Sequence, residues 1–83
     1  LYHNYPNPFN PATTIRYDLP RESRIRLAVY DLTGREVALL HDGMQQAGRH
    51  EVEWNAAPFA SGVYMIRMQT EGWSQVSKMM LIK

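Results

Sequence analysis

Hydrophobic and polar residues alternate along most of the chain, in short stretches separated by turn-forming residues. This alternation has the period of a β-strand, in which successive side chains point to opposite faces. It predicts a strand at residues 13–19, with Ile15, Tyr17 and Leu19 on one buried face, and a second strand at residues 24–30. Each strand should therefore turn one face toward a hydrophobic core and the other toward water.

A tight hairpin turn is predicted directly after the second strand, at Asp31-Leu32-Thr33-Gly34. Asp31 favours the start of a turn, and Gly34 supplies the positive φ that a short loop with a bulge requires. Residues 35–40 are therefore predicted to return as a strand, although Glu36 and its neighbours also have good helix propensity. Residues 41–49 are polar and contain two glycines, which predicts a loop or a short irregular strand.

The second half of the chain continues the same pattern. Further strands are predicted at residues 50–54, 63–70 and 73–82. The strand that begins at Val63 is apolar on both faces in its first half, as is typical of a central strand. Strands at roughly ten-residue spacing without a convincing helix predict one all-β domain over residues 1–83, an immunoglobulin-like antiparallel β-sandwich of about seven short strands.

Composition excludes several classes of function. The 83 residues carry a formal net charge of +1, which gives no electrostatic reason to expect nucleic-acid binding. A chain this short buries only about 60% of its unfolded surface, which leaves little room for a buried active site, and no run approaches the roughly 20 apolar residues needed for membrane insertion. We expect neither enzymatic activity nor a cofactor.

Candidate chemical sites are few. The histidines, His3, His41 and His50, are scattered, and the chain has no cysteine, so no metal site is expected. Ser61 precedes Gly62 but lacks the surrounding glycines of a nucleophile elbow.

Outward-pointing arginines are the main charged feature of the predicted sheet. They are Arg16, Arg24, Arg26 and Arg35. They either form a basic strip that binds an acidic partner or lipid phosphates, or belong to a solvated face on which Asp18 and Glu36 neutralise part of the charge.

The last predicted strand is apolar on both faces from Met79 to Ile82 and is flanked by Lys78 and Lys83. A terminal edge strand can accept a strand from a partner, with the lysines recognised by it, or the lysines can guard against random pairing. Trp73, Met79 and Met80 offer an adaptable docking surface or pack in the core, and core packing is predicted for most of them.

Three motifs together resemble a known family. Near the start lies Tyr5-Pro6-Asn7-Pro8-Phe9, where prolines predict a stiff, extended lead into the first strand. The others are Ser61-Gly62-Val63-Tyr64 and the lysine-flanked last strand. With Asp31 and Gly34 in the middle, these motifs resemble the C-terminal sorting domain of proteins exported by the bacterial type IX secretion system.

This resemblance implies that the domain functions as a sorting signal. Such a domain follows an N-terminal cargo domain in the same chain, passes through the periplasm, and is recognised by the outer-membrane translocon. A sortase-like peptidase usually removes it, and the cargo is then anchored at the cell surface or secreted. By similarity, the residues that the translocon recognises are Gly62, Val63, Tyr64, Lys78, Met79, Leu81 and Lys83. Structural duties are the alternative, since Gly62 supplies special backbone geometry and Tyr64 resembles a core or corner tyrosine.

Two other functions remain open from the sequence. An immunoglobulin-like module retained on a secreted enzyme would use Trp73 and Tyr2 to contact carbohydrate. The immunoglobulin-like domain of the flagellar hook-cap protein has a related pattern, so similarity of fold alone does not establish secretion. Because the first residue is not methionine, we expect the sequence to be a piece of a longer secreted protein.

Overall fold

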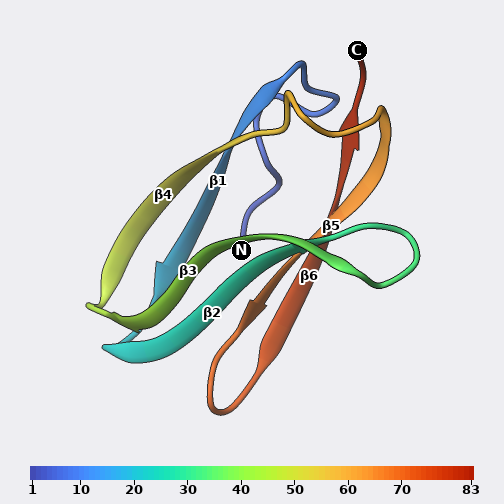
Figure 1. Cartoon of the computed structure of the whole chain (residues 1–83). Coiled ribbons are helices and arrows are strands. Elements are labelled where there is room, and N and C mark those ends of the chain that lie inside the picture. Colours follow the sequence, from blue (N-terminus) through green and yellow to red (C-terminus); the bar gives the residue numbers. More distant parts are fainter.

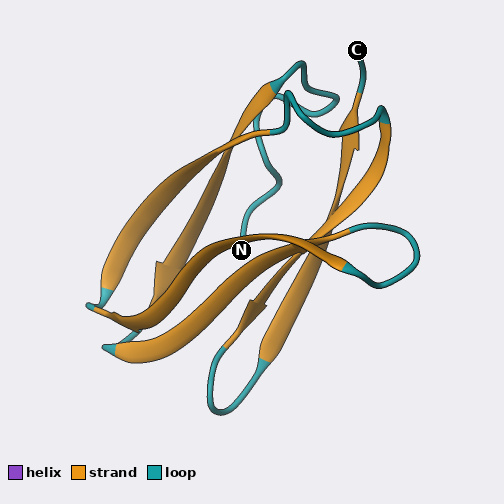
Figure 2. Cartoon of the chain, in the orientation of Figure 1, coloured by secondary structure: helices purple, strands orange, loops and turns teal.

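The computed structural model describes residues 1–83 as six β-strands without a helix (Figures 1 and 2). The strands are β1 (Ala12–Leu19), β2 (Ser23–Tyr30), β3 (Glu36–Gln45), β4 (Gly48–Asn55), β5 (Gly62–Gln69) and β6 (Ser74–Leu81). They form two antiparallel sheets, one of β1 and β4 and one with the order β3-β2-β5-β6. The all-β architecture is confirmed and is compatible with an immunoglobulin-like sandwich, with six strands where about seven were predicted.

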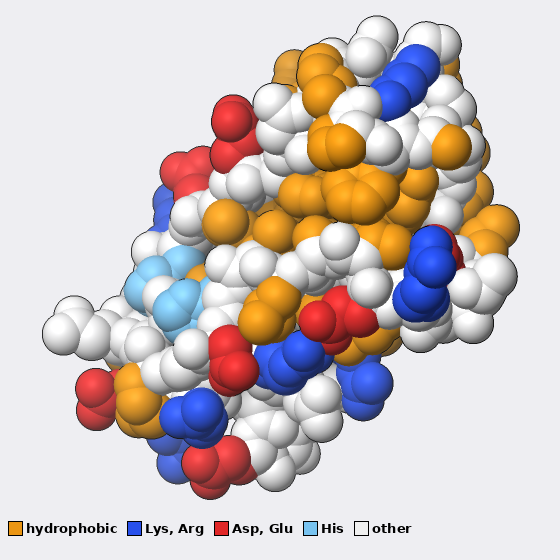
Figure 3. Space-filling view, viewed as in Figure 1, with side chains coloured by type: hydrophobic (Ala, Val, Ile, Leu, Met, Phe, Trp, Pro, Cys, Tyr) orange, Lys and Arg blue, Asp and Glu red, His pale blue; other side chains and the backbone are white.

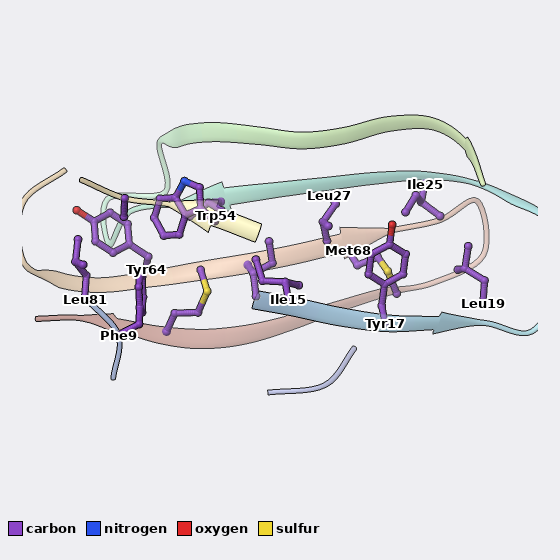
Figure 4. Packing of buried hydrophobic residues seen from close by; sticks show 14 residues of the cluster. Phe9, Ile15, Tyr17, Leu19, Ile25, Leu27, Trp54, Tyr64, Met68 and Leu81 are labelled. Atoms are coloured by element: carbon purple, nitrogen blue, oxygen red, sulfur yellow. The ribbon is translucent and has the colours of Figure 1, made fainter. Parts of the chain in front are cut away.

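The core lies between the two sheets and follows the predicted alternation (Figure 4). In β1, Ile15, Tyr17 and Leu19 are buried, whereas Arg16 and Asp18 are exposed. The other sheet contributes buried side chains from β2, β5 and β6. These are Ile25, Leu27, Val29, Tyr64, Ile66, Met68, Met79 and Leu81. As predicted, β5 lies inside its sheet, between β2 and β6.

The hairpin turn predicted after the second strand is confirmed. Gly34 has φ +86° and its N–H donates to the Asp31 carbonyl at 3.0 Å. The Asp31 carboxylate accepts hydrogen bonds from the N–H groups of Thr33 and Arg35, at 2.9 and 3.1 Å. The Asp31 side chain therefore reinforces a turn that backbone hydrogen bonds also close.

Of the two alternatives predicted for residues 41–49, a loop or a short irregular strand, the loop was wrong. β3 continues through Gln45, and β4 begins at Gly48, so these residues are mostly strand. The length of the strand is set by pairing, because Arg24 and Ile25 of β2 lie opposite Met44 and Gly43. Backbone hydrogen bonds to a neighbouring strand outweigh a local composition that is typical of loops.

The segment before β1 also differs from the predicted extended lead. Bends occupy residues 6–8 and 10–11, and the peptide bonds preceding Pro6, Pro8 and Pro11 are cis. Tyr5 pairs with Thr14 on β1, and Phe9 forms a parallel bridge with Leu81 on β6. The segment therefore spans from one sheet to the other and covers part of both edges.

Candidate functional site

The three sequence motifs meet at one end of the sandwich, which we call the motif end: residues 4–9, 56–64 and 78–83. In Figure 1 the proline-rich loop, the loop between β4 and β5, and the C-terminus all lie at this end. The convergence places side by side segments that are more than seventy positions apart. The three motifs that carry the resemblance therefore lie on one surface of the molecule.

Asn7 links the first motif to the last. Its Oδ1 accepts the Met80 N–H at 3.0 Å, and its Nδ2 donates to the Lys78 carbonyl at 3.4 Å. Met80 and Lys78 point these backbone groups away from β5, because β6 residues bond to β5 alternately. The Asn7 amide therefore satisfies edge groups of β6 in the way that a neighbouring strand would.

Phe9 extends the same contact through its backbone. Its N–H donates to the Met80 carbonyl and its carbonyl accepts the Ile82 N–H, both at 3.0 Å. Its side chain is 2% exposed and lies 5.7 Å from the Trp54 ring. This part of the β6 edge is consequently occupied by the chain itself, so the predicted addition of a partner strand would require its displacement.

Aromatic rings fill the interior of the motif end. Trp54 lies at their centre, with ring centroids 5.5 Å from Tyr64 and 5.7 Å from Phe59. The Trp54–Tyr64 pair is edge-to-face, the arrangement that aromatic quadrupoles favour. Figure 4 shows Phe9, Trp54, Tyr64 and Leu81 gathered at one end of the core. The first and second motifs are therefore held together by packing of Phe9 and Tyr64 against Trp54.

Tyr64 is a buried core tyrosine. This structural role was the alternative to recognition of Tyr64 by the translocon. Tyr64 is 7% exposed, and its hydroxyl donates to the Ala60 carbonyl at 2.6 Å. This bond fixes the loop between β4 and β5 against the start of β5. Gly62, two residues earlier, has φ +153° and open space where a Cβ would lie, so backbone conformation is what favours glycine there.

Lys83 folds back onto the same loop. Its N–H donates to Ser61 Oγ at 3.0 Å, and its ammonium group donates to the Ala57 carbonyl. The end of the chain is thereby attached to the motif that contains Gly62. Lysine at this position makes a contact that a shorter side chain cannot reach.

The predicted recognition residues divide by exposure. Buried side chains belong to Tyr64, Met79 and Leu81. Gly62, Lys78 and Lys83 are exposed, and Val63 is half-buried. Core packing holds for Met79, whereas Trp73 and Met80 are 41% and 40% exposed. The polar residues before Lys78 are explained by β6 being an edge strand whose first half is exposed.

Sequence reasoning missed a buried polar network that anchors the first motif. Asn4, 4% exposed, donates through Nδ2 to Thr13 Oγ1 at 3.0 Å and to the Pro6 carbonyl at 3.1 Å. Thr13 in turn donates to the same carbonyl at 2.8 Å. The only signal in the sequence was a threonine at an inward position of the first strand, since buried polar groups need partners.

Of the two alternatives for the outward arginines, the basic strip does not form. Arg16 lies on β1, in a different sheet from Arg24 and Arg26, because β1 pairs with β4 and not with β2. Three of the arginines pair with carboxylates. These pairs are Arg24–Asp42 at 3.7 Å, Arg26–Glu36 at 2.7 Å and Arg35–Asp31 at 3.6 Å. In Figure 3, basic side chains (blue) lie beside carboxylates (red) along the lower part of the molecule.

Hydrogen bonds lower the pKa of two carboxyl groups that lie outside the motif end. The Arg26 guanidinium lowers the pKa of Glu36, and the Thr33 hydroxyl lowers the pKa of Asp31. Both shifts are explained by structural contacts.

Nowhere do three or more His, Asp or Glu side chains come together in a way that could hold a metal ion. The chain has no helix, and therefore none that could span a bilayer.

Comparisons with known proteins agree with the motifs. The family model described as the secretion system C-terminal sorting domain matches residues 3–83. Comparisons with curated proteins and with solved structures found no match. The family match favours sorting over an accessory module retained on an enzyme, and it implies a secreted or cell-surface cargo protein and a non-catalytic role. The chain belongs to the secretion system C-terminal sorting domain family, and such a domain is the C-terminal sorting signal for type IX secretion.

Proposed function

We propose that this domain directs an N-terminal cargo domain of the same chain through the periplasm to the type IX translocon, which recognises the motif end. The convergence of the three motifs on one surface carries this proposal. A receptor that contacts this end meets residues from all three segments at once, although they are far apart in the sequence. A sortase-like peptidase then removes the domain from the cargo.

The predicted recognition residues take two kinds of role in this proposal. Gly62, Lys78 and Lys83 are exposed and available to touch the translocon. Tyr64, together with buried Met79 and Leu81, holds the surface in shape from inside, through packing and the bond to Ala60. Substitutions of Lys78 and Lys83 should therefore affect export with little change in stability, whereas substitutions of the buried residues should also destabilise the domain.

An export assay tests the recognition surface. A reporter carrying this domain at its C-terminus is compared with the double variant Lys78→Ala/Lys83→Ala, in which the core is untouched. Arg16→Ala/Arg21→Ala is the matched control, because both arginines are exposed and lie outside the motif end. We expect loss of export for the lysine variant alone. Unchanged export of a folded lysine variant would contradict recognition through these residues.

Mass spectrometry of the exported reporter tests removal. If the peptidase acts as proposed, the periplasmic form contains residues 4–83, and the exported form ends upstream of Asn4. An exported form that still ends at Lys83 would show that sorting occurs without cleavage. This outcome would leave recognition intact and refute only the step of removal.

A further inference from the structure

The hairpin of β5 and β6 has an outer face, turned away from the core, that is both apolar and cationic. We call it the β5–β6 outer face. Its residues are Val63, Met65, Arg67, Val76, Lys78 and Met80. They lie directly opposite one another as Val63–Met80, Met65–Lys78 and Arg67–Val76. Of the intervening residues, Tyr64, Ile66 and Met79 are buried and Ser77 is half-buried.

The two cations of this face lack carboxylate partners. Arg67 and Lys78 are both exposed, and their side chains make no ion pair or hydrogen bond within the chain. Their directly opposite neighbours are the apolar side chains of Val76 and Met65. By contrast, the sheet arginines Arg24 and Arg26 each have a carboxylate within 4 Å. The positive charges of Arg67 and Lys78 are therefore not compensated, whereas those of Arg24 and Arg26 on the neighbouring strand are.

Apolar side chains around these cations are also uncovered. Val76 is 55% exposed and Met80 is 40% exposed. Val76 borders a hollow of about 430 Å³, whose lining also includes Tyr30, Leu32 and Arg67. The one carboxylate on its rim is Asp31, which is engaged by Thr33 and Arg35 in the hairpin turn. The rim of the hollow therefore offers no free carboxylate to neutralise the face.

We propose that the β5–β6 outer face docks an extended polypeptide segment that carries carboxylates among apolar side chains. Its carboxylates pair with Arg67 and Lys78, and guanidinium can bind a carboxylate through two parallel hydrogen bonds. Its apolar side chains cover Val76, Met65 and Met80, and methionine adapts readily to partners of different shape. An anionic membrane is a poorer fit, because lipid-binding patches commonly gather about four to eight cations.

This inference goes beyond the proposed function. It can be tested with the purified chain and without any export component. The probe is a peptide of about eight residues, the length of a typical strand, in which valine and glutamate alternate. A peptide of the same length with lysine in place of glutamate is the matched probe. We expect the glutamate peptide, and not the lysine peptide, to shift the NMR methyl signals of Met65, Val76 and Met80.

Charge reversal locates the binding. The double variant Arg67→Glu/Lys78→Glu should bind the glutamate peptide roughly tenfold more weakly, as expected for the loss of two exposed charge pairs. Arg16→Glu/Arg21→Glu makes the same change in net charge elsewhere and should bind as the unaltered chain does. Thermal unfolding of both variants confirms that they fold.

Three results would overturn the proposal. One is an equal response to both peptides, which would mean binding without charge selection. Another is equal weakening by the two double variants, which would mean a general effect of net charge. The third is the absence of a peptide response together with binding to phosphatidylglycerol vesicles that the Arg67→Glu/Lys78→Glu variant loses, which would assign the face to a membrane.

Discussion

Asn7 and Met80, 73 positions apart in the sequence, are joined by a hydrogen bond in which the Met80 N–H donates to Asn7 Oδ1 at 3.0 Å. The bond places a side-chain amide where a further strand would otherwise pair with β6. It ties the proline-rich motif to the last strand. The first half of the β6 edge, which includes Val76, receives no backbone hydrogen bond from the N-terminal segment. The motif end therefore depends on contacts that close only in the folded chain.

The first prediction concerns this bond. Asn7→Ala should lower the free energy of unfolding by about 1 to 2 kcal/mol, because it removes two side-chain hydrogen bonds and a typical one contributes about 1 kcal/mol. It should also speed hydrogen exchange at the Met80 amide, because that amide loses its acceptor. Asn10→Ala is the control, since Asn10 also precedes a proline but makes no side-chain hydrogen bond. Equal effects of the two substitutions in denaturant unfolding and exchange would contradict the role of Asn7.

The second prediction separates the hydroxyl of Tyr64 from its ring. Tyr64→Phe keeps the packing against Trp54 but removes the donor to the Ala60 carbonyl. We expect a loss of about 1 to 2 kcal/mol in chemical denaturation, because a partly buried carbonyl is left without its partner. Tyr5→Phe serves for comparison, as Tyr5 is 63% exposed and its hydroxyl makes no bond. A Tyr64→Phe protein as stable as Tyr5→Phe would show that the loop is fixed by packing alone.

The third prediction concerns the hairpin turn. Gly34→Val should destabilise the domain by about 1 to 2 kcal/mol, because an L side chain disfavours the left-handed backbone that φ +86° requires. No atom crowds the position, so the effect is conformational and not steric contact with a neighbour. Gly72→Val, at a turn glycine without positive φ, should cost less. Comparable thermal midpoints for the two variants would refute this explanation.

The fourth prediction concerns the response to acid. The hydrogen bond from Arg26 lowers the pKa of Glu36 below its ordinary value of 4.5. A carboxyl with a lower pKa in the folded state stabilises the fold above its unfolded pKa, and this contribution is lost as the pH falls through the folded value. The stability difference between the unaltered chain and Glu36→Gln should therefore shrink as the pH is lowered from about 6 to about 3.

Glu53→Gln provides the comparison for that experiment. Glu53 is exposed on β4 and takes part in none of the ion pairs. Its substitution should leave the pH dependence of unfolding nearly unchanged. A Glu36→Gln difference that stays constant across the same pH range would mean that the contact with Arg26 does not stabilise the fold through charge.

The alternation of side chains predicted much of the fold. The first two strands and the hairpin turn were predicted correctly, since a period of two and a turn sequence are local properties. The buried faces of Ile15, Tyr17 and Leu19 followed from the same pattern. The end of β3 was not predicted, because its last residues are held by pairing with β2 and not by their own preference.

The sequence by itself determined the class of fold and the family, because periodicity, turn residues and short motifs are written along the chain. Only the tertiary structure decided which strands are neighbours, and it separated Arg16 from the other arginines by pairing β1 with β4. It also brought Asn7, Ser61 and Lys83 to one surface. Such placements depend on long-range hydrogen bonds and on a shared core, whose partners are fixed by three-dimensional packing and are not encoded in any local segment.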